Sequence, residues 1–124
     1  MSFVANDNDR ICSIWKLIET DREAGLKELA VLAEAGDKPA IESYALYLSE
    51  ETPTTEEAVK WLLRANEFDS ASAAWNLAMV AREQGKPFEM RQWINRAAEL
   101  GEEDALELKN NGYDVEAVLA KYLD

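Results

Sequence analysis

Apolar residues along this chain recur at intervals of three and four positions, which is the spacing of one helical face and not the alternation of a strand. Alanine and leucine are frequent, and we expect the five glycines and three prolines to fall between the periodic segments. One apolar face lies within a helix expected over residues 8–18 and consists of Ile11, Ile14, Trp15 and Ile18. The pattern therefore predicts an all-α protein.

Eight helical segments are expected, and residues that cap helix ends mark several of their limits. Thr20 and Glu23 have the spacing of a capping box, in which each side chain bonds to the other residue's backbone N–H group. Thr54 and Glu57 repeat this spacing, and Gly36 is expected to end a helix in the left-handed conformation. The expected segments are residues 8–18, 21–35, 38–49, 54–67, 70–84, 87–100, 102–110 and a last one that Asp114 caps.

A repeat with a period of 33 and then 32 residues runs through the chain. Its matching positions are Glu34, Glu67 and Glu99, followed by the small residues Ala40, Ala73 and Ala105. Each period holds two short helical segments with a short connection, which makes neighbouring helices antiparallel. Because one such pair cannot bury its apolar face alone, the period predicts an α-solenoid whose stacked pairs share a core. We expect one domain over residues 1–124, divided into a capping pair (1–35), two repeats (36–68 and 69–100) and a partial repeat with a cap (101–124).

Two segments, Trp61–Glu67 and Trp93–Gly101, resemble the closing half of the Sel-one-like repeat, a relative of the tetratricopeptide repeat. That half reads roughly Trp-Tyr-x-Lys-Ala-Ala-Glu-x-Gly. The segment Ala73–Ala78 resembles the opening half, and the resemblance covers about residues 23–107. The chain departs from the pattern at Asp69, where the repeat usually has glycine. The resemblance implies a right-handed α-solenoid that holds partner proteins as a scaffold, adaptor or inhibitor and carries no chemistry of its own.

Composition removes most catalytic classes. The 124 residues include no histidine and a single cysteine, Cys12, so histidine-based catalysis, histidine metal sites, an internal disulfide and cysteine zinc clusters are excluded. The five glycines are scattered and form no phosphate-binding loop. We therefore expect no enzyme, no cofactor and no metal. We also expect Cys12 to be a small buried apolar residue beside Ile11.

The formal net charge of −12 bears on partners and location. It disfavours nucleic-acid binding, which needs clustered lysine and arginine, and it favours a basic partner or simply a well-solvated surface. Glu50, Glu51, Glu56 and Glu57 lack the ligand spacing of a calcium loop. Solvated helix ends are the favoured interpretation of these residues, and a docking patch for a basic protein is the alternative. With no secretory signal in the first ten residues and no run of about 18 apolar residues, we expect a cytoplasmic protein without membrane contact.

The first helix of each pair lines the concave side of such a solenoid, and it carries the candidate binding residues. Tryptophan, tyrosine, methionine and arginine are typical of interface centres, whereas ordinary solvent exposure is the alternative. The candidates are Glu42, Ser43 and Tyr47 in the third helix, Trp75, Asn76, Met79 and Arg82 in the fifth, and Glu107 in the seventh. The other tryptophans, Trp15, Trp61 and Trp93, are expected in the core.

Two binding functions fit this sequence, and a self-associating structural unit, with the last helix as a cap or dimer seam, is a further class. The leading expectation is a non-catalytic protein-interaction module, a small scaffold or adaptor that binds a partner protein with its concave face. The alternative is an immunity protein that neutralises a cognate, basic bacterial toxin, because an acidic surface attracts a basic one. The chain is expected to be a monomer or a weak homodimer.

Overall fold

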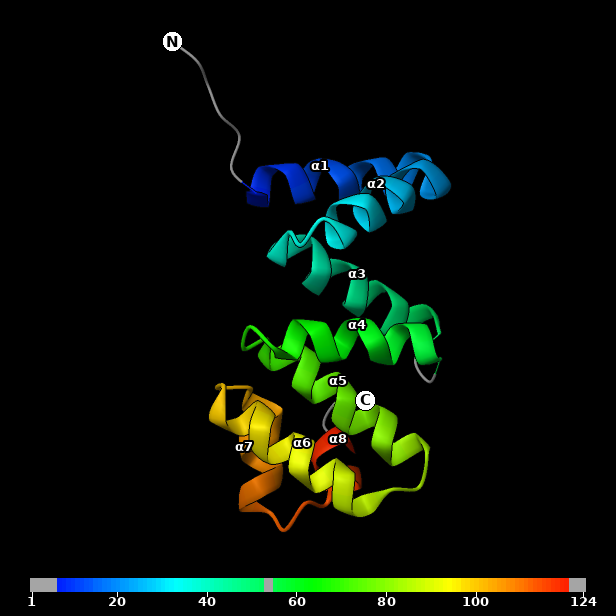
Figure 1. Cartoon of the computed structure of the whole chain (residues 1–124). Helices are drawn as coiled ribbons and strands as arrows, with labels where there is room; N and C mark the ends of the chain where they lie inside the picture. Colours follow the sequence, from blue (N-terminus) through cyan, green and yellow to red (C-terminus); the bar gives the residue numbers. More distant parts are fainter. Residues whose placement is uncertain (1–6, 53–54, 121–124) are drawn as a thin grey trace.

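The computed structural model describes residues 7–52 and 55–120, and all regular structure in this part of the chain is helical (Figure 1). This confirms the all-α prediction, with helix limits that differ from the expected ones by up to two residues. The eight helices of this part are α1 (Asp7–Thr20), α2 (Arg22–Glu34), α3 (Lys38–Glu51), α4 (Glu56–Asn66), α5 (Ala71–Glu83), α6 (Pro87–Glu99), α7 (Glu103–Asn110) and α8 (Val115–Leu119).

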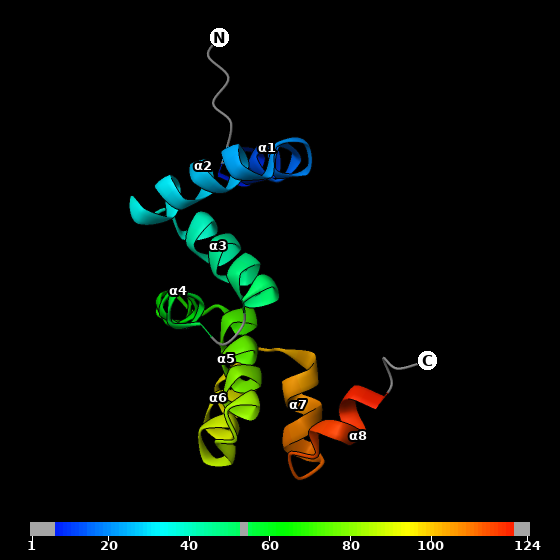
Figure 2. The same ribbon diagram turned by 90° about the vertical axis from the view of Figure 1, so that its right-hand side faces the viewer.

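Each helix packs against the next one along the chain, and α3 also contacts α1 and α5. The helices follow one another from α1 and α2 at one end of the molecule to α6, α7 and α8 at the other (Figure 1). Figure 2 shows α4 on one side of α5, with α7 and α8 on the opposite side. The chain therefore presents two different faces along its length, one that includes α4 and α6 and one that includes α7 and α8.

The apolar side chains form two buried clusters, one that joins α1 through α5 and one that joins α5 through α8. Trp61 lies in the first cluster and is completely buried, as expected for a core position. The other three tryptophans are only partly buried. Trp15 packs against the first cluster, Trp75 against the second, and Trp93 against both.

The starts of α3, α5 and α7 repeat one arrangement. A residue with positive φ precedes a capping residue, whose side-chain oxygen accepts the N–H of an alanine three positions further on. The capping residues are Asp37, Ser70 and Glu102, and the alanines, all completely buried, are Ala40, Ala73 and Ala105. The positive-φ residues are Gly36 (93°), Asp69 (64°) and Gly101 (91°). Aspartate tolerates this backbone region better than most residues, so Asp69 replaces glycine and keeps the same turn.

Two expected capping boxes are wrong in their first residue. Thr20 is the last residue of α1, and Asp21 caps α2 by accepting the N–H of Ala24 at 3.2 Å. Thr55 caps α4 by accepting the N–H of Ala58 at 3.2 Å, whereas Thr54 lies outside the described residues. In both places a neighbouring oxygen-bearing side chain takes the role, because the capping position lies one residue later than expected.

Two expectations about single residues are also wrong. Cys12 is exposed, because it lies beside the apolar face of α1 that carries Ile11 and Ile14 and not on it. Gly25 is buried inside α2 and not between helices. A Cβ atom at this position would lie 2.7 Å from the backbone nitrogen of Ile18, so glycine is what allows α2 to approach α1 this closely.

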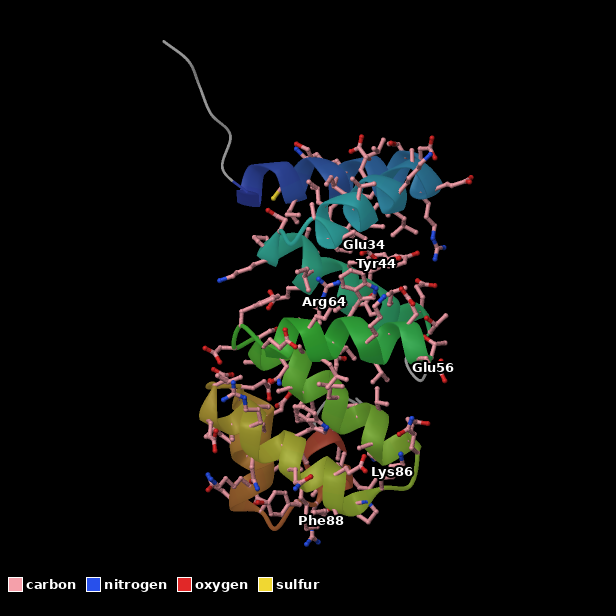
Figure 3. The ribbon with its side chains drawn as sticks, in the orientation of Figure 1. Glu34, Tyr44, Glu56, Arg64, Lys86 and Phe88 are labelled. Atoms are coloured by element: carbon pink, nitrogen blue, oxygen red, sulfur yellow. The ribbon has the colours of Figure 1, made fainter. Side chains whose placement is uncertain are left out.

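Tyr44 of α3 occupies the space between α2 and α4, where Figure 3 shows it close to Glu34 and Arg64. Its ring meets the buried ring of Trp61 edge to face, with 5.3 Å between the ring centres. Burial raises the pKa of the Tyr44 hydroxyl, and the carboxylates of Glu57 and Glu34 raise it further. This tyrosine therefore fills a partly buried position between two successive helix pairs.

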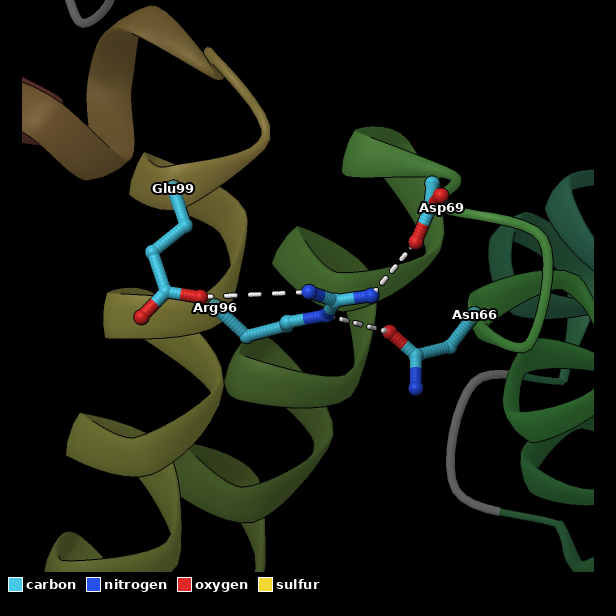
Figure 4. Close-up of polar contacts among 4 residues, drawn as sticks. All are labelled: Asn66, Asp69, Arg96 and Glu99. Carbon is cyan, nitrogen blue, oxygen red and sulfur yellow. Dashed lines mark hydrogen bonds and ion pairs between the residues drawn. The ribbon is translucent and has the colours of Figure 1, made fainter.

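Arg96 makes the polar connection between the next two pairs (Figure 4). From α6 it reaches the turn between α4 and α5, where its Nη2 lies 2.7 Å from the carboxylate of Asp69 and its Nε lies 3.4 Å from Oδ1 of Asn66. Its other terminal nitrogen lies 3.8 Å from Glu99. In the preceding pair, Arg64 has the same position, but Gly36 replaces Asp69 there, and Arg64 lies over the ring of Trp61 instead.

Candidate partner-binding site

The structure places all eight candidate binding residues at an intermediate exposure, neither in the core nor fully in solvent. Glu42, Ser43 and Tyr47 lie on α3, Trp75, Asn76, Met79 and Arg82 on α5, and Glu107 on α7. They do not form one continuous site. Trp75 and Asn76 line one cavity, Arg82 lines a different one, and Tyr47 lies in a separate group of contacts. The first of these cavities holds two of the candidates.

That cavity lies where α3, α5 and the start of α7 meet, and its volume is about 170 Å³. Its lining includes two of the eight candidates, Trp75 and Asn76. The remaining lining residues are Leu46, Ser49, Glu50, Ser72 and Glu102. We call this set of seven residues the Trp75 cavity.

Asn76 fixes one wall of the Trp75 cavity. Its Nδ2 donates to the backbone oxygen of Ser72 at 2.8 Å, so the side chain is held along α5. Its Oδ1 lies 3.4 Å from the hydroxyl of Ser49, which also lies 2.9 Å from the backbone oxygen of Leu46. These bonds join α3 to α5 and use the polar atoms of Asn76 and Ser49 within the chain.

The two carboxylates of the Trp75 cavity come from opposite ends of helices. Glu50 is exposed near the end of α3, whereas Glu102 is half-buried and caps α7, with its Oε2 2.6 Å from the backbone nitrogen of Ala105. Burial raises the pKa of Glu102, and the neighbouring Asp104 and Glu103 raise it further, although hydrogen bonds from backbone N–H groups oppose the shift. The cavity therefore presents an indole ring beside two acidic groups.

Tyr47 belongs to a second group of contacts, on a different face of the same half of α3. Arg22 donates from its Nε to the Tyr47 hydroxyl at 2.6 Å and forms an ion pair with Glu51 at 3.0 Å. The ring of Trp15 lies 6.2 Å from that of Tyr47. Tyr47 thus ties α1, α2 and α3 together and lies apart from the Trp75 cavity.

Arg82 and Met79 belong to a third group, where α5 approaches the last helices. Arg82 forms an ion pair with Glu116 of α8, and Met79 packs against the second core cluster. The Arg82 guanidinium therefore connects α5 to α8 in addition to any role toward a partner. Asn111 donates from its Nδ2 to the backbone oxygen of Glu107 at 2.7 Å, which holds the end of α7.

The sequence favoured a solvated helix end for Glu50 over a docking patch, and neither Glu50 nor Glu102 was among the eight candidate binding residues. The repeat itself carries a signal for Glu102, because it matches the caps Asp37 and Ser70, and therefore starts a helix beside its neighbour. For Glu50 we find no such signal, since its place beside Trp75 depends on how α3 and α5 cross.

The described residues contain no group of three or more histidine, cysteine, aspartate or glutamate side chains that could hold a metal ion. Within residues 7–52 and 55–120, no helix has both the length and the apolar composition needed to cross a membrane. Comparisons of the chain with protein-family models, with curated proteins and with solved structures found no match.

Proposed function

We propose that this chain is a right-handed α-solenoid of Sel-one-like repeats that binds a partner protein and performs no catalysis. The repeated start of α3, α5 and α7 supports the repeat assignment, because cap, turn and buried alanine recur in register. The contacts of α3 with α1 and α5 support stacking of the first helices of successive pairs. In this arrangement α1, α3, α5 and α7 line the binding face.

The observation that carries the proposal is the Trp75 cavity. Its volume of about 170 Å³ is similar to that of protein cavities that hold one benzene-sized group, roughly 150 Å³, so it suits one side chain of a partner. An indole ring beside two carboxylates favours a cation, because the ring face and both acidic groups attract positive charge. We propose that a lysine or arginine side chain of the partner enters here. The net charge of −12 draws a basic partner toward the same face.

The test compares two glutamate-to-lysine variants of equal charge. Glu50→Lys places a cation in the Trp75 cavity, whereas Glu83→Lys places one at an exposed position about two turns further along α5 than Trp75. A partner captured from the native host is expected to bind the wild type and Glu83→Lys with similar affinity and Glu50→Lys at least about tenfold more weakly. Equal losses of affinity in the two variants would show that only the overall charge matters and would contradict partner binding at the Trp75 cavity.

A scaffold or adaptor role is the first candidate, and an immunity protein against a basic toxin is the second. The second is favoured by the acidic surface, because a toxin that handles nucleic acid is basic where it holds its substrate. The two are separated by the activity of the partner. An immunity protein abolishes the toxin's activity at one equivalent, and its affinity falls as salt is added, whereas an adaptor leaves the partner active.

A further inference from the structure

A second hollow lies on the opposite side of α5, between α4 and α6. Its volume is about 540 Å³, and its inner surface is apolar. The apolar lining consists of Val59 and Leu63 of α4, Leu77, Val80 and Ala81 of α5, and Trp93 of α6. Its edge carries Glu56, Lys60, Gln84, Lys86 and Glu89. We call this hollow the inter-pair slot.

One repeat earlier, the equivalent space lies between α2 and α4, and side chains of α3 fill it. The three α5 residues of the lining have larger counterparts 33 positions earlier, since Tyr44, Tyr47 and Leu48 correspond to Leu77, Val80 and Ala81. The two tryptophans that bound these spaces differ in burial as this difference in size predicts. Trp61 is completely buried under Tyr44, whereas Trp93 at the matching position is partly exposed.

The filled space between α2 and α4 indicates which kind of side chain fits the inter-pair slot. Tyr44 lies with its ring edge-to-face against Trp61, at 5.3 Å between ring centres and an interplanar angle of 76°. An aromatic ring that enters the inter-pair slot would meet Trp93 in the same way, because the two tryptophans have equivalent positions. The slot therefore suits an aromatic side chain that this part of the chain does not itself provide.

The charges around the slot favour a second copy of this chain as the source of that ring. The edge carries two lysines and two glutamates, and none of these four forms an ion pair with another described residue. In a chain of net charge −12 this is a locally neutral surface. Two copies related by a two-fold axis can place each lysine near a glutamate of the other copy, so the edge is complementary to itself.

An exposed ring lies close to the edge of the slot. Phe88, at the start of α6, is 73% exposed, and its neighbours Lys86 and Glu89 belong to the edge of the slot. Figure 3 shows Phe88 near Lys86 at the α6 end of the molecule. A two-fold interface requires that one patch carry both the inserted group and the recess that receives it, and this patch carries both.

We propose that two copies of the chain associate through the face of α4 and α6, with Phe88 of each copy in the inter-pair slot of the other. The Trp75 cavity lies on the other side of α5, so this association leaves the proposed partner-binding face open. The inference does not depend on the proposed function.

Sedimentation velocity from low micromolar to near-millimolar concentration tests the proposal. The wild type is expected to pass from monomer to dimer as its concentration rises. Phe88→Ala removes the inserted ring, and Leu63→Glu places a charge on the slot wall at a position that is already 42% exposed. Each change is expected to weaken dimerisation by about tenfold or more. Leu106→Ala and Leu106→Glu, at an exposed position of α7, are the matched controls and are expected to dimerise as the wild type does.

Mixing the two weakened variants gives a second readout. Phe88→Ala keeps an open slot and Leu63→Glu keeps the inserted ring, so an equimolar mixture regains one of the two contacts and dimerises more strongly than either variant alone. A wild type that remains monomeric throughout would overturn the proposal, as would a dimer that neither variant weakens. A monomer that binds N-acetyltyrosinamide, seen as a shift of the Trp93 indole resonance, would assign the slot to a different protein and overturn the role of a second copy.

Discussion

Trp61 and Trp93 occupy the same position of the repeat, yet the structure predicts that their removal has very different effects. Trp61 is completely buried, its ring contacts Tyr44, and its Nε1 donates to Glu57 at 2.8 Å. Truncation of such a residue to alanine costs about 3–5 kcal/mol of unfolding free energy. That is a large part of the roughly 5–15 kcal/mol that holds a typical domain together.

Trp93→Ala is expected to cost about two-thirds as much, roughly 2–3.3 kcal/mol, because Trp93 is only partly buried and the apolar area lost scales with the area that was buried. Trp93 lines the inter-pair slot, and no ring within residues 7–52 and 55–120 is stacked on it as Tyr44 is on Trp61. The alanine therefore enlarges an existing hollow and does not create a new internal cavity.

Urea unfolding followed by far-ultraviolet circular dichroism measures both losses, at a protein concentration low enough to keep the chain monomeric. The unfolding slope should stay constant, so that the change in midpoint reports stability alone. The free energy of unfolding is expected to fall at least about 1 kcal/mol further in Trp61→Ala than in Trp93→Ala. Equal losses would show that Trp93 is as enclosed as Trp61 and would remove the basis for an open slot.

Three further predictions concern single residues. Ala73→Leu adds volume at a completely buried position and should lower the unfolding free energy by about 1–3 kcal/mol, and an unchanged melting temperature would contradict its core position. Gly25→Ala should lower the unfolding free energy despite the better helix propensity of alanine, since its Cβ would meet the backbone of Ile18 at 2.7 Å. Urea unfolding measures this change, and a higher unfolding free energy in the variant would show that α1 shifts away and would contradict the prediction. The raised pKa of Glu102 means that the folded chain holds this proton more tightly than the unfolded chain does, so stability contributed by this group is lost as the pH rises through the folded-state pKa. The unfolding free energy of the wild type should therefore rise relative to Glu102→Gln as the pH is lowered toward the ordinary glutamate value of about 4.3, and a difference that stays flat over this range would contradict the shift.

Much of the fold follows from local signals in the sequence. The 3.6-residue periodicity and the repeated cap and alanine determine where helices begin and how they pair, because these effects act within a few residues. Asp21 and Thr55 cap α2 and α4 in place of the expected threonines. Capping is a local effect, so any oxygen-bearing side chain at the capping position can serve once that position moves by one residue. Periodicity was less informative for Cys12, which lies next to the apolar face of α1 and not on it.

The sites depended on contacts between helices and were harder to predict. Trp75 and Asn76 were found because their residue types stand out on the face of α5, but Glu50 joins them only through the crossing of α3 and α5. Arg82 was expected at the same face, yet its ion pair with Glu116 depends on the position of α8, which the repeat does not specify. The inter-pair slot does have a signal in the sequence, but finding it requires a comparison of side-chain sizes at matching positions of the repeats.

The proposed binding site can be tested most directly by nuclear magnetic resonance with a probe that carries the expected cation. Hexa-arginine peptide is titrated into the chain while the indole N–H resonances of the four tryptophans are followed, with hexa-glutamate peptide as the control. Binding of an arginine side chain in the Trp75 cavity predicts a saturable shift of the Trp75 signal that Glu50→Lys suppresses and Glu83→Lys retains. A Trp75 signal that does not move, or shifts of equal size at Trp15 and Trp93, would contradict a site formed by Trp75, Glu50 and Glu102.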